Sequence, residues 1–485
     1  MKRPLLSLLI NAALFFASYA IKSQNIPEIN PNYLNNLFEN YKIQESNAFY
    51  KGRYLMITPF EFESTLEYFA NYKRNIGFDV CIVNTKTTGT TPEAIKNFIQ
   101  NQYDNLSTRP TYILLAGDVD HIPAFEGDPS GTVKKNPITD LGYSLLEGND
   151  FIADIFLGRF AVANINQLKN IINKTIFMEV NLHLLEKKAV FIAGDEKKGV
   201  WNKSYMTNVF KSGHEYVILN SFIPLGYLCL KLYKPDVKSV VNALSNNPLF
   251  YFYAGHGNCT TFAGKSFDMG NKEILSATNT IFPFVFSFAC KTGNFAQTCI
   301  GKQFIRAQNK GAVAFFGSSV NSQTNTDKIM EKKMFGNSFK DEERLLSPMI
   351  NLGMKRLAKT VGIRSKMKEI TLKAYNLLGD PSLDMKGLFA STSDNDKIIH
   401  PAHFSLFRNP LNDEFSLAYT LENESFVQID MCDTEGTLIK NLVQIPQQKA
   451  GIYYYNFSLT DLPSNVYDFT YIDSTKRVSM QIKKQ

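Results

Sequence analysis

The sequence predicts an α/β protein with two parallel-sheet subdomains, followed by a smaller β-sandwich. From residue 51 to residue 387, short segments rich in aromatic and β-branched residues alternate with amphipathic segments of helical length, a pattern typical of parallel sheets. From residue 399 to residue 485, short strand-like segments are separated by Asn, Asp and Gly turns, which indicates a β-sandwich beyond a linker over 388–398. The chain has 485 residues, 44% of them apolar, enough for two or three domains.

The first 20 residues have the pattern of a secretory signal peptide. Met1-Lys2-Arg3 precedes an apolar run over residues 5–16, and Ser18-Tyr19-Ala20 is a small-x-small cleavage site. Polar residues interrupt the run, and no later stretch is long and apolar enough to span a membrane. We therefore expect an exported protein with a polar leader over residues 21–50 and no transmembrane anchor after signal removal.

Charge and cysteine content exclude two classes of protein. The formal net charge is +7, and the basic residues are scattered among 45 acidic ones, so no nucleic-acid partner is predicted. Six cysteines in a chain of this length do not form a dense disulfide framework. Cys81 and Cys229 lie in strand-like segments and are expected to be buried thiols. Cys259 and Cys299 flank the site described below and could pair in an oxidising compartment.

The first α/β subdomain is predicted over residues 51–186. Strands are expected at 54–58, 80–83 and 112–116, and helices at 61–74 and from Pro92 onwards, with Thr91 as N-cap. Asp118, Asp120 and His121 follow the third strand. Because carboxylates suit Ca²⁺, a structural calcium site is one interpretation of this cluster. The interpretation that we favour is a capped turn without a metal.

The second subdomain, predicted over residues 187–387, is expected to carry the chemistry. Its strands are expected at 189–193, 216–219, 249–254, 284–289 and 311–316. One of these strands ends in Gly255-His256-Gly257, and Cys290 follows the next strand, 34 positions after His256. That spacing is long enough for a crossover between parallel neighbours, whose carboxyl ends meet at one edge of the sheet. The sequence therefore predicts an imidazole and a thiol at the same edge.

A thiol beside an imidazole is the combination that nucleophilic catalysis requires. The thiolate is the attacking form, and an imidazole can raise the thiolate fraction and later protonate a leaving amine. The amides of Gly257 and Cys290 are candidates for an oxyanion hole, and Gly255 lets a substrate backbone approach closely. The competing interpretation is a buried strand-end thiol and a turn histidine. Glycines beside both residues favour the catalytic interpretation.

Two sequence blocks surround these residues: Tyr253-Ala254-Gly255-His256-Gly257-Asn258 and the segment 287–295, Ser-Phe-Ala-Cys-Lys-Thr-Gly-Asn-Phe. They resemble the His and Cys blocks of the gingipain family, which are cysteine endopeptidases with a caspase-like fold. The similarity covers about 270 residues in consistent order, through 114–118, 122–124, 148–150, 156–160, 317–319 and 378–383. The resemblance therefore implies two caspase-like α/β subdomains.

The resemblance also implies roles for residues outside the two blocks. Glu196 takes the place of an acidic residue that orients the catalytic imidazole, with Asp195 as the competing candidate. Ser318 and Ser319 follow another predicted strand and are expected to line the substrate groove.

Substrate specificity is not settled by the resemblance. Relatives that cleave after Arg or Lys use an acidic side chain in the S1 pocket, because a buried cation needs a counter-charge. They also carry a tryptophan at a place that Thr324 occupies here. The carboxylates available to a cationic side chain are Asp195, Asp268 and Asp327, and the sequence does not select among them.

The C-terminal segment contains Asn409-Pro410-Leu411, Asp433-Thr434-Glu435-Gly436 and a Leu-Pro-Ser-Asn-Val-Tyr run over 462–467, and it ends in Lys483-Lys484 before Gln485. These features resemble the type IX secretion sorting domain of Bacteroidetes-like bacteria, which implies a partner in the secretion machinery. An ordinary immunoglobulin-like accessory domain is the alternative. Either interpretation predicts an immunoglobulin-like β-sandwich over 399–485.

Together these observations predict a secreted or surface-located cysteine endopeptidase that forms a thioester intermediate, acts on polypeptides and requires no cofactor. One alternative is a non-catalytic surface homologue that binds polypeptides in the same groove. The other is a transpeptidase, in which an amine instead of water resolves the thioester during processing of sorting signals.

Overall fold

The computed structural model describes residues 51–126, 138–182, 185–195, 203–263, 268–336, 345–385, 404–408 and 414–483, the last range with gaps at 422, 450, 460–461, 464 and 476. These residues fall into two compact units, one within Ala48–Ser393 and one within Asp394–Gln485. The predicted signal peptide, leader and linker lie outside the described residues, as do Glu196 and Asn409-Pro410-Leu411.

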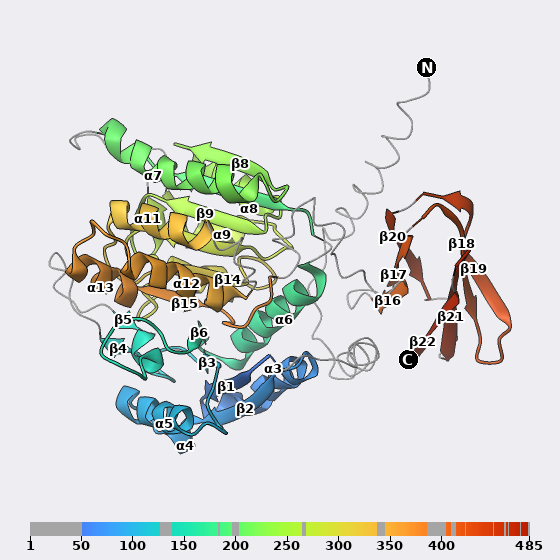
Figure 1. Ribbon diagram of the computed structural model, residues 1–485, viewed down its shortest axis with the longest axis horizontal. Helices are drawn as coiled ribbons and strands as arrows, with labels where there is room; N and C mark the ends of the chain where they lie inside the picture. The colour runs from blue at the N-terminus through green and yellow to red at the C-terminus, as the bar shows by residue number, and fades with distance from the viewer. Residues whose placement is uncertain are drawn as a thin grey trace. The chain divides into compact units, whose positions relative to one another are not determined.

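The first unit is built on one ten-stranded sheet (Figure 1). In spatial order its strands are β2 (Asp79–Asn84), β1 (Arg53–Thr58), β3 (Tyr112–Ala116), β6 (Phe156–Phe160), β15 (Tyr375–Leu378), β14 (Ala314–Ser318), β13 (Phe284–Phe288), β9 (Phe250–Ala254), β7 (Lys188–Ala193) and β8 (Leu228–Tyr233). Neighbouring strands are parallel except β14 and β15, which are antiparallel. The direction of the sheet therefore reverses once, at its middle.

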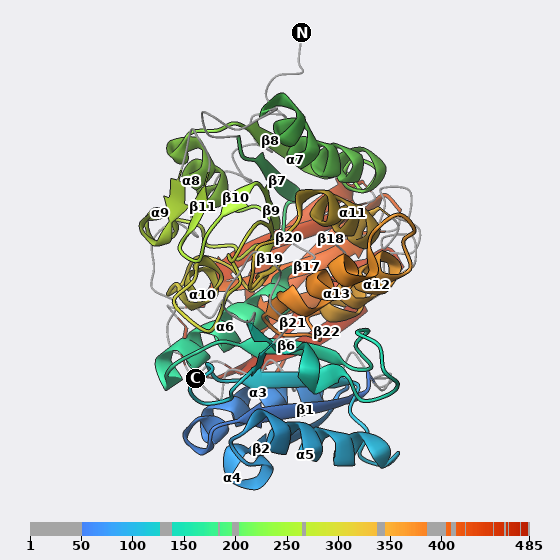
Figure 2. The same ribbon diagram turned by 90° about the vertical axis from the view of Figure 1, so that its left-hand side faces the viewer.

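Both faces of this sheet are covered, which explains why its central strands are continuous apolar runs. Every residue of β3, β9, β13 and β14 is buried. In Figure 2, α7 (Lys203–Val217), α11 (Thr324–Phe335), α12 (Leu346–Ala358) and α13 (Ser365–Ala374) lie on one side of the sheet, and α8 (Val237–Ser245), α9 (Asn271–Ser276) and α10 (Ile300–Arg306) lie on the other. The α/β class with a parallel sheet is confirmed.

The N-terminal half of the sheet carries α3 (Glu63–Asn75), α5 (Pro92–Asp104) and α6 (Ile165–Asn181). The predicted start of α5 is confirmed, since the Thr91 hydroxyl accepts a hydrogen bond from the Ala94 N–H at 3.2 Å, with Pro92 in the first turn. β15, from the predicted second subdomain, pairs with β6 of the first. Strands of the two segments thus join in one sheet.

Arg159, in one of the segments that carried the resemblance, is a structural residue. Its side chain is buried, and its Nε and Nη2 donate to the two carboxylate oxygens of Asp140 at 2.7 Å. Its Nη1 donates to the carbonyls of Gly117 and Ile122 at 2.8 Å. One guanidinium thereby fixes the loop after β3 to Asp140, the residue that precedes a 3₁₀ turn over 141–144.

Two predictions for the edges of the sheet are wrong. Residues 216–219, expected as a strand, continue α7 into a π-helical turn, η4 (Ile218–Phe222). Phe210, His214, Val217 and Ile218 are buried at helical spacing while Leu219 is exposed, so the apolar residues follow the period of a helix that packs on the sheet, through contacts such as His214 with Phe191, and not the alternation of a strand. The strand here is β8 instead. Cys81 and Cys229, expected to be buried, are half-buried because β2 and β8 are the two edge strands.

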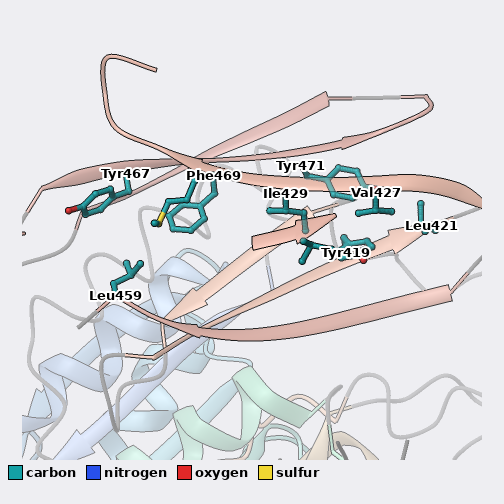
Figure 3. Packing of buried hydrophobic residues seen from close by; sticks show 10 residues of the cluster. Tyr419, Leu421, Val427, Ile429, Leu459, Tyr467, Phe469 and Tyr471 are labelled. Atoms are coloured by element: carbon teal, nitrogen blue, oxygen red, sulfur yellow. The ribbon is translucent and has the colours of Figure 1, made fainter. Parts of the chain in front are cut away.

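The second unit consists of two antiparallel sheets, as predicted for a β-sandwich. One contains β16 (Phe404–Arg408), β17 (Glu414–Leu421) and β20 (Gly451–Ser458), and the other contains β19 (Leu438–Gln448), β18 (Ser425–Cys432), β21 (Val466–Asp473) and β22 (Arg477–Lys483). Burial alternates along β18, as expected for a strand with one face on a core. Tyr419, Ile429, Phe469 and Tyr471 lie in that core (Figure 3).

Candidate active site

The His and Cys blocks leave the sheet side by side. β9 and β13 are parallel neighbours in which Ala254 is paired with Phe288, the last residue of each strand. The predicted placement of His256 and Cys290 after adjacent parallel strands is therefore confirmed. The Gly255 N–H donates to the Phe288 carbonyl at 3.4 Å, which extends the pairing one residue beyond the strands.

Gly257 brings the two blocks into direct contact. A Cβ atom at this position would lie 2.8 Å from Cγ2 of Thr292, 3.0 Å from the carbonyl oxygen of Cys290 and 3.1 Å from Cβ of Ala289. Only glycine fits without displacing the turn that carries the thiol. Gly257 therefore links the loop that carries His256 (the histidine loop) to the turn that carries Cys290 (the cysteine turn).

Gly257→Ala is expected to lower kcat by about 100-fold, because the added methyl group must push the histidine loop and the cysteine turn apart, and displacements near 1 Å at reacting groups have effects of this size. Steady-state cleavage of a peptide mixture would measure it. Gly436→Ala, in the second unit, is the control: its φ of 82° makes the change cost some stability, but no atom lies within 4 Å of a Cβ there, so kcat should be unchanged. An unchanged kcat for Gly257→Ala would show that the contact does not position the site.

The backbone of the histidine loop is held rigidly. β10 (His256–Gly257) pairs with β11 (Thr261–Ala263). The Tyr253 hydroxyl donates to the carbonyls of His256 at 2.5 Å and Ala263 at 2.9 Å. The ring of Phe210 meets the imidazole edge-on, with centroids 5.8 Å apart. His256 is half-buried, so its ring is supported on one side and accessible in part.

Cys290 is half-buried at the start of a tight turn. Lys291 has φ = 62°, a left-handed conformation that is uncommon outside glycine, and its N–H donates to the Val320 carbonyl at 2.9 Å. Burial, followed by the negative charge of Asp327, raises the pKa of the Cys290 thiol, although Ser322 and Lys291 act in the opposite direction. The resting thiol is therefore protonated at neutral pH and needs a base to become a nucleophile.

A carboxylate candidate lies beside the histidine loop. β7 runs next to β9, and the Gly194 N–H donates to the Ala254 carbonyl at 2.9 Å. A Cβ at Gly194 would lie 3.5 Å from Cα of Gly255, so the two loops are in contact. Asp195 follows directly and is buried. The orienting role of Glu196 or Asp195 stays a prediction.

The predicted substrate-groove residues are enclosed. The side chains of Ser318 and Ser319 are buried, and the Ser318 hydroxyl donates to the Val320 carbonyl at 2.9 Å. The Ser319 hydroxyl has no hydrogen-bond partner within the described part of the chain. At Gly255 the space for a Cβ is taken by the Tyr253 hydroxyl, 2.6 Å away. These contacts explain the small residues by packing, and contact of the three with substrate remains a prediction.

A small cleft adjoins both strand ends. It is lined by residues of α7, α11 and the last positions of β9 and β13, namely Val209, Phe210, Ala254, Phe288, Thr324, Asp327, Lys328 and Glu331. Of the three carboxylates left open by the sequence, Asp268 is exposed on β12 (Asp268–Gly270), whereas Asp327 lines this cleft. Burial raises the pKa of Asp327 to about 7.

Sequence reasoning missed Phe210 and Ser322, which contact the two predicted catalytic residues. The Cys290 sulfur lies 3.9 Å from the Ser322 carbonyl oxygen and 4.0 Å from its hydroxyl. Neither Phe210 nor Ser322 belongs to a motif, and each reaches the site only because α7 and the loop after β14 fold back over the strand ends.

The cluster after β3 forms a capped turn. The Asp118 carboxylate accepts a hydrogen bond from the Val119 N–H at 3.0 Å, and it pairs with Lys302 at 2.8 Å and with Arg306 at 2.5 Å. Burial alone would raise the pKa of Asp118, but the Lys302 hydrogen bond and the Arg306 charge outweigh burial and lower it. Within the described ranges no three His, Cys, Asp or Glu side chains are grouped to hold a metal ion. The prediction that no cofactor is required stays untested, as does the alternative of a structural calcium ion.

Cys259 and Cys299 lie close together as free thiols. The Ile300 N–H donates to the Cys259 carbonyl at 2.6 Å, and the Cys299 sulfur accepts from the Lys302 N–H at the start of α10. Burial raises the pKa of Cys299 to about 11. The thiol of Cys299 therefore serves as a helix cap in this structure.

Solved structures share this fold. The crystal structure of the Arg-specific cysteine proteinase gingipain R aligns with a TM-score of 0.60 at 22% identity, over 90% of this chain and 99% of that chain. A further protease structure aligns with a TM-score of 0.63 at 20% identity, over 91% and 99% of the two chains. No helix in the described ranges combines the length and apolar character that crossing a membrane requires.

A cysteine thiol and a histidine imidazole that follow neighbouring strands of this fold indicate that the protein is of the cysteine-peptidase class. The sequence model of peptidase family C25 matches residues 47–386 of the chain. The chain belongs to peptidase family C25.

Individual relatives share less than a third of their aligned residues with this chain. Gingipain R2 of Porphyromonas gingivalis (strain ATCC BAA-308 / W83) is 27% identical over 359 residues, which are 70% of this chain and 46% of the relative. Lys-gingipain HG66 of Porphyromonas gingivalis is 29% identical over 287 residues, or 57% of this chain and 16% of the relative. The chain thus spans less than half the length of these relatives.

Proposed function

We propose that this protein is an exported cysteine endopeptidase that hydrolyses peptide bonds in polypeptides through Cys290 and His256. The observation that carries the proposal is the contact of Gly257 with the Cys290 turn at neighbouring strand ends. Export is supported by the signal-peptide pattern and by the sorting-like β-sandwich, which would engage the secretion machinery. Membership of a cysteine-peptidase family supports the reaction class.

The first half of the reaction forms a thioester. His256 removes the proton of the Cys290 thiol, and the thiolate attacks the carbonyl carbon of the scissile bond. The Gly257 and Cys290 amides would stabilise the oxyanion of the tetrahedral intermediate. The imidazolium then donates its proton to the leaving amine, and the C–N bond breaks.

The second half restores the enzyme. His256 removes a proton from water, the resulting hydroxide attacks the thioester, and the C–S bond breaks to release a carboxylic acid and the thiol. Asp195 or Glu196 would hold the imidazole in the correct tautomer and stabilise its charged form. This sequence uses only groups of the chain and water.

Active-site-directed labelling tests this proposal. A peptidyl acyloxymethyl ketone is expected to alkylate Cys290, located by peptide mass spectrometry, and to stop cleavage of a mixed peptide library in proportion to the labelled fraction. The five other cysteines serve as internal controls, because alkylation by a substrate-like ketone requires an activated thiolate in a substrate groove. Labelling elsewhere, or full labelling with undiminished cleavage, would contradict it. Products that carry an added amine would indicate transpeptidation.

A further inference from the structure

Behind the thiol lies a chain of polar side chains that the proposed mechanism does not use. The Cys290 sulfur lies 4.0 Å from the Ser322 hydroxyl. The Ser322 side chain hydrogen-bonds both Asp327 and Tyr375, and the Tyr375 hydroxyl donates to Oδ1 of Asp327 at 2.8 Å. Asp327 and Tyr375 are both buried, 4% and 5% exposed. A continuous polar path thus leads from the thiol into the protein.

The direction of the Ser322 hydroxyl depends on the proton of Asp327. Tyr375 has one proton to donate, and it is directed at Asp327. If Asp327 is ionised, its carboxylate also accepts the Ser322 proton, so Ser322 has no proton for the sulfur. If Asp327 is protonated, it can donate to the Ser322 oxygen, and the Ser322 hydroxyl then donates to a thiolate, which is a charged and therefore stronger acceptor than the neutral Tyr375 oxygen.

We propose that Asp327, acting through Ser322, is a positioning residue for Cys290: in its neutral form it turns the Ser322 hydroxyl toward the sulfur and stabilises the thiolate, and in its ionised form it withdraws that donor. Three elements meet here, because Cys290 follows β13, Ser322 follows β14 and Tyr375 begins β15. Asp327 stands on the first turn of α11. The proposal rests on the proposed function only in taking Cys290 as the nucleophile.

The charges around Asp327 are consistent with a carboxyl that changes its protonation near neutral pH. Burial is the main cause of its raised pKa, and Glu331 on the same helix adds to it. Glu331 is itself paired with the buried His214 of α7. Lys328 lines the same cleft, and Tyr375 and Cys290 face Asp327 from the sheet.

The test measures the thiol directly and does not depend on peptide cleavage. The rate of Cys290 alkylation by iodoacetamide, followed by mass spectrometry from pH 5 to pH 9, is compared for wild type, Asp327→Asn and Ser322→Ala. Asp327→Asn imitates the neutral form of Asp327 at every pH, because its side chain is uncharged and has an N–H donor. It is expected to alkylate roughly tenfold faster at pH 8, because one like charge beside the sulfur is removed. Its alkylation rate should follow the ionisation of Cys290 alone, whereas the wild-type rate should also respond to the ionisation of Asp327, which opposes thiolate formation.

Ser322→Ala is expected to slow alkylation by roughly fivefold at pH 6, since the thiolate loses a charge-assisted hydrogen bond. Asp104→Asn, an exposed change at the end of α5, is the control and should match the wild type. If the wild type and Asp327→Asn gave superimposable profiles of alkylation rate against pH, the proposal would be overturned. If Asp327→Asn does not fold, a Ser322→Ala alkylation rate equal to that of the wild type would overturn it. Failure of the proposed function would look different: the alkylation ratios would hold while no variant cleaved peptides.

Discussion

Cys290→Ala is expected to abolish peptide cleavage, on the order of a 10⁶-fold loss in kcat by analogy with nucleophile removal in serine proteases. The sulfur forms the bond to the acyl group, and no described side chain beside it replaces that role: Ser322 approaches the sulfur but lies 4.0 Å away and hydrogen-bonds Asp327. The measurement is cleavage of a mixed peptide library with product detection by mass spectrometry over several days, so that a low residual rate is still seen.

The matched control is Cys81→Ala, a half-buried thiol on edge strand β2 of the same sheet. It should retain the wild-type kcat and lose at most about 1 kcal/mol of stability, because it removes one partly exposed sulfur. Cys290→Ala should fold equally well, since the turn is held by backbone hydrogen bonds such as Lys291 to Val320. Undiminished cleavage by folded Cys290→Ala would reject the nucleophile assignment and favour the non-catalytic interpretation of the site.

The part of the site that could be predicted from the sequence is the part set by strand ends. The runs before His256 and Cys290 are apolar at every position because β9 and β13 are central strands covered on both faces. A strand of this kind has little ambiguity, and Gly255 directly after β9 marks where that strand ends. The adjacency of the two blocks followed from their spacing, which suits one crossover between parallel neighbours.

What could not be predicted depends on contacts between segments distant in sequence. Asp327 was one of three open carboxylates, and its placement in the cleft follows from how α11 packs against α7 and the strand ends. The edge strand β8 was missed as well: it exposes Leu228 and Leu230, whereas the helical segment 216–219 contains a denser apolar run. The hydrophobic pattern of a short segment predicts whether its residues are buried. In this sheet, burial depends on which other elements pack against the segment, and the local pattern does not identify those elements.

The segments that carried the family resemblance outside the two blocks hold the sheet together. Asp380, in Leu378-Gly379-Asp380-Pro381-Ser382-Leu383, is fully buried and accepts hydrogen bonds from the Tyr54 hydroxyl at 2.6 Å and from Ser382 at 3.0 Å. Its other oxygen pairs with Lys73 at 2.6 Å. Lys73 also contacts both carboxylate oxygens of Glu179 at 2.8 Å. One ammonium on α3 thus pairs with two buried carboxylates, from α6 and from the loop after β15.

Lys73→Met is expected to lower the free energy of unfolding of the first unit by about 3–5 kcal/mol, because it leaves two carboxylates buried without a cation. Lys73 and Asp380 are 0% exposed and Glu179 is 3% exposed, so solvent cannot compensate. Urea unfolding followed by circular dichroism at 222 nm reports on this unit, since the α-helices that the structure describes all lie within Ala48–Ser393. Lys366→Met is the control: that lysine is 60% exposed and pairs with Glu369 on the same helix, so at most about 0.5 kcal/mol should be lost.

The loss of unfolding free energy in Lys73→Met, relative to the wild type, is also expected to shrink as the pH falls from 7 toward 5. Burial raises the pKa of Glu179 in the folded protein even with Lys73 present, and removal of the ammonium can only raise it further. A carboxyl whose pKa is higher in the folded than in the unfolded state holds more protons when folded, so acidification favours the folded form. A deficit that stayed constant or grew on acidification would show that Lys73 contributes by packing rather than by charge.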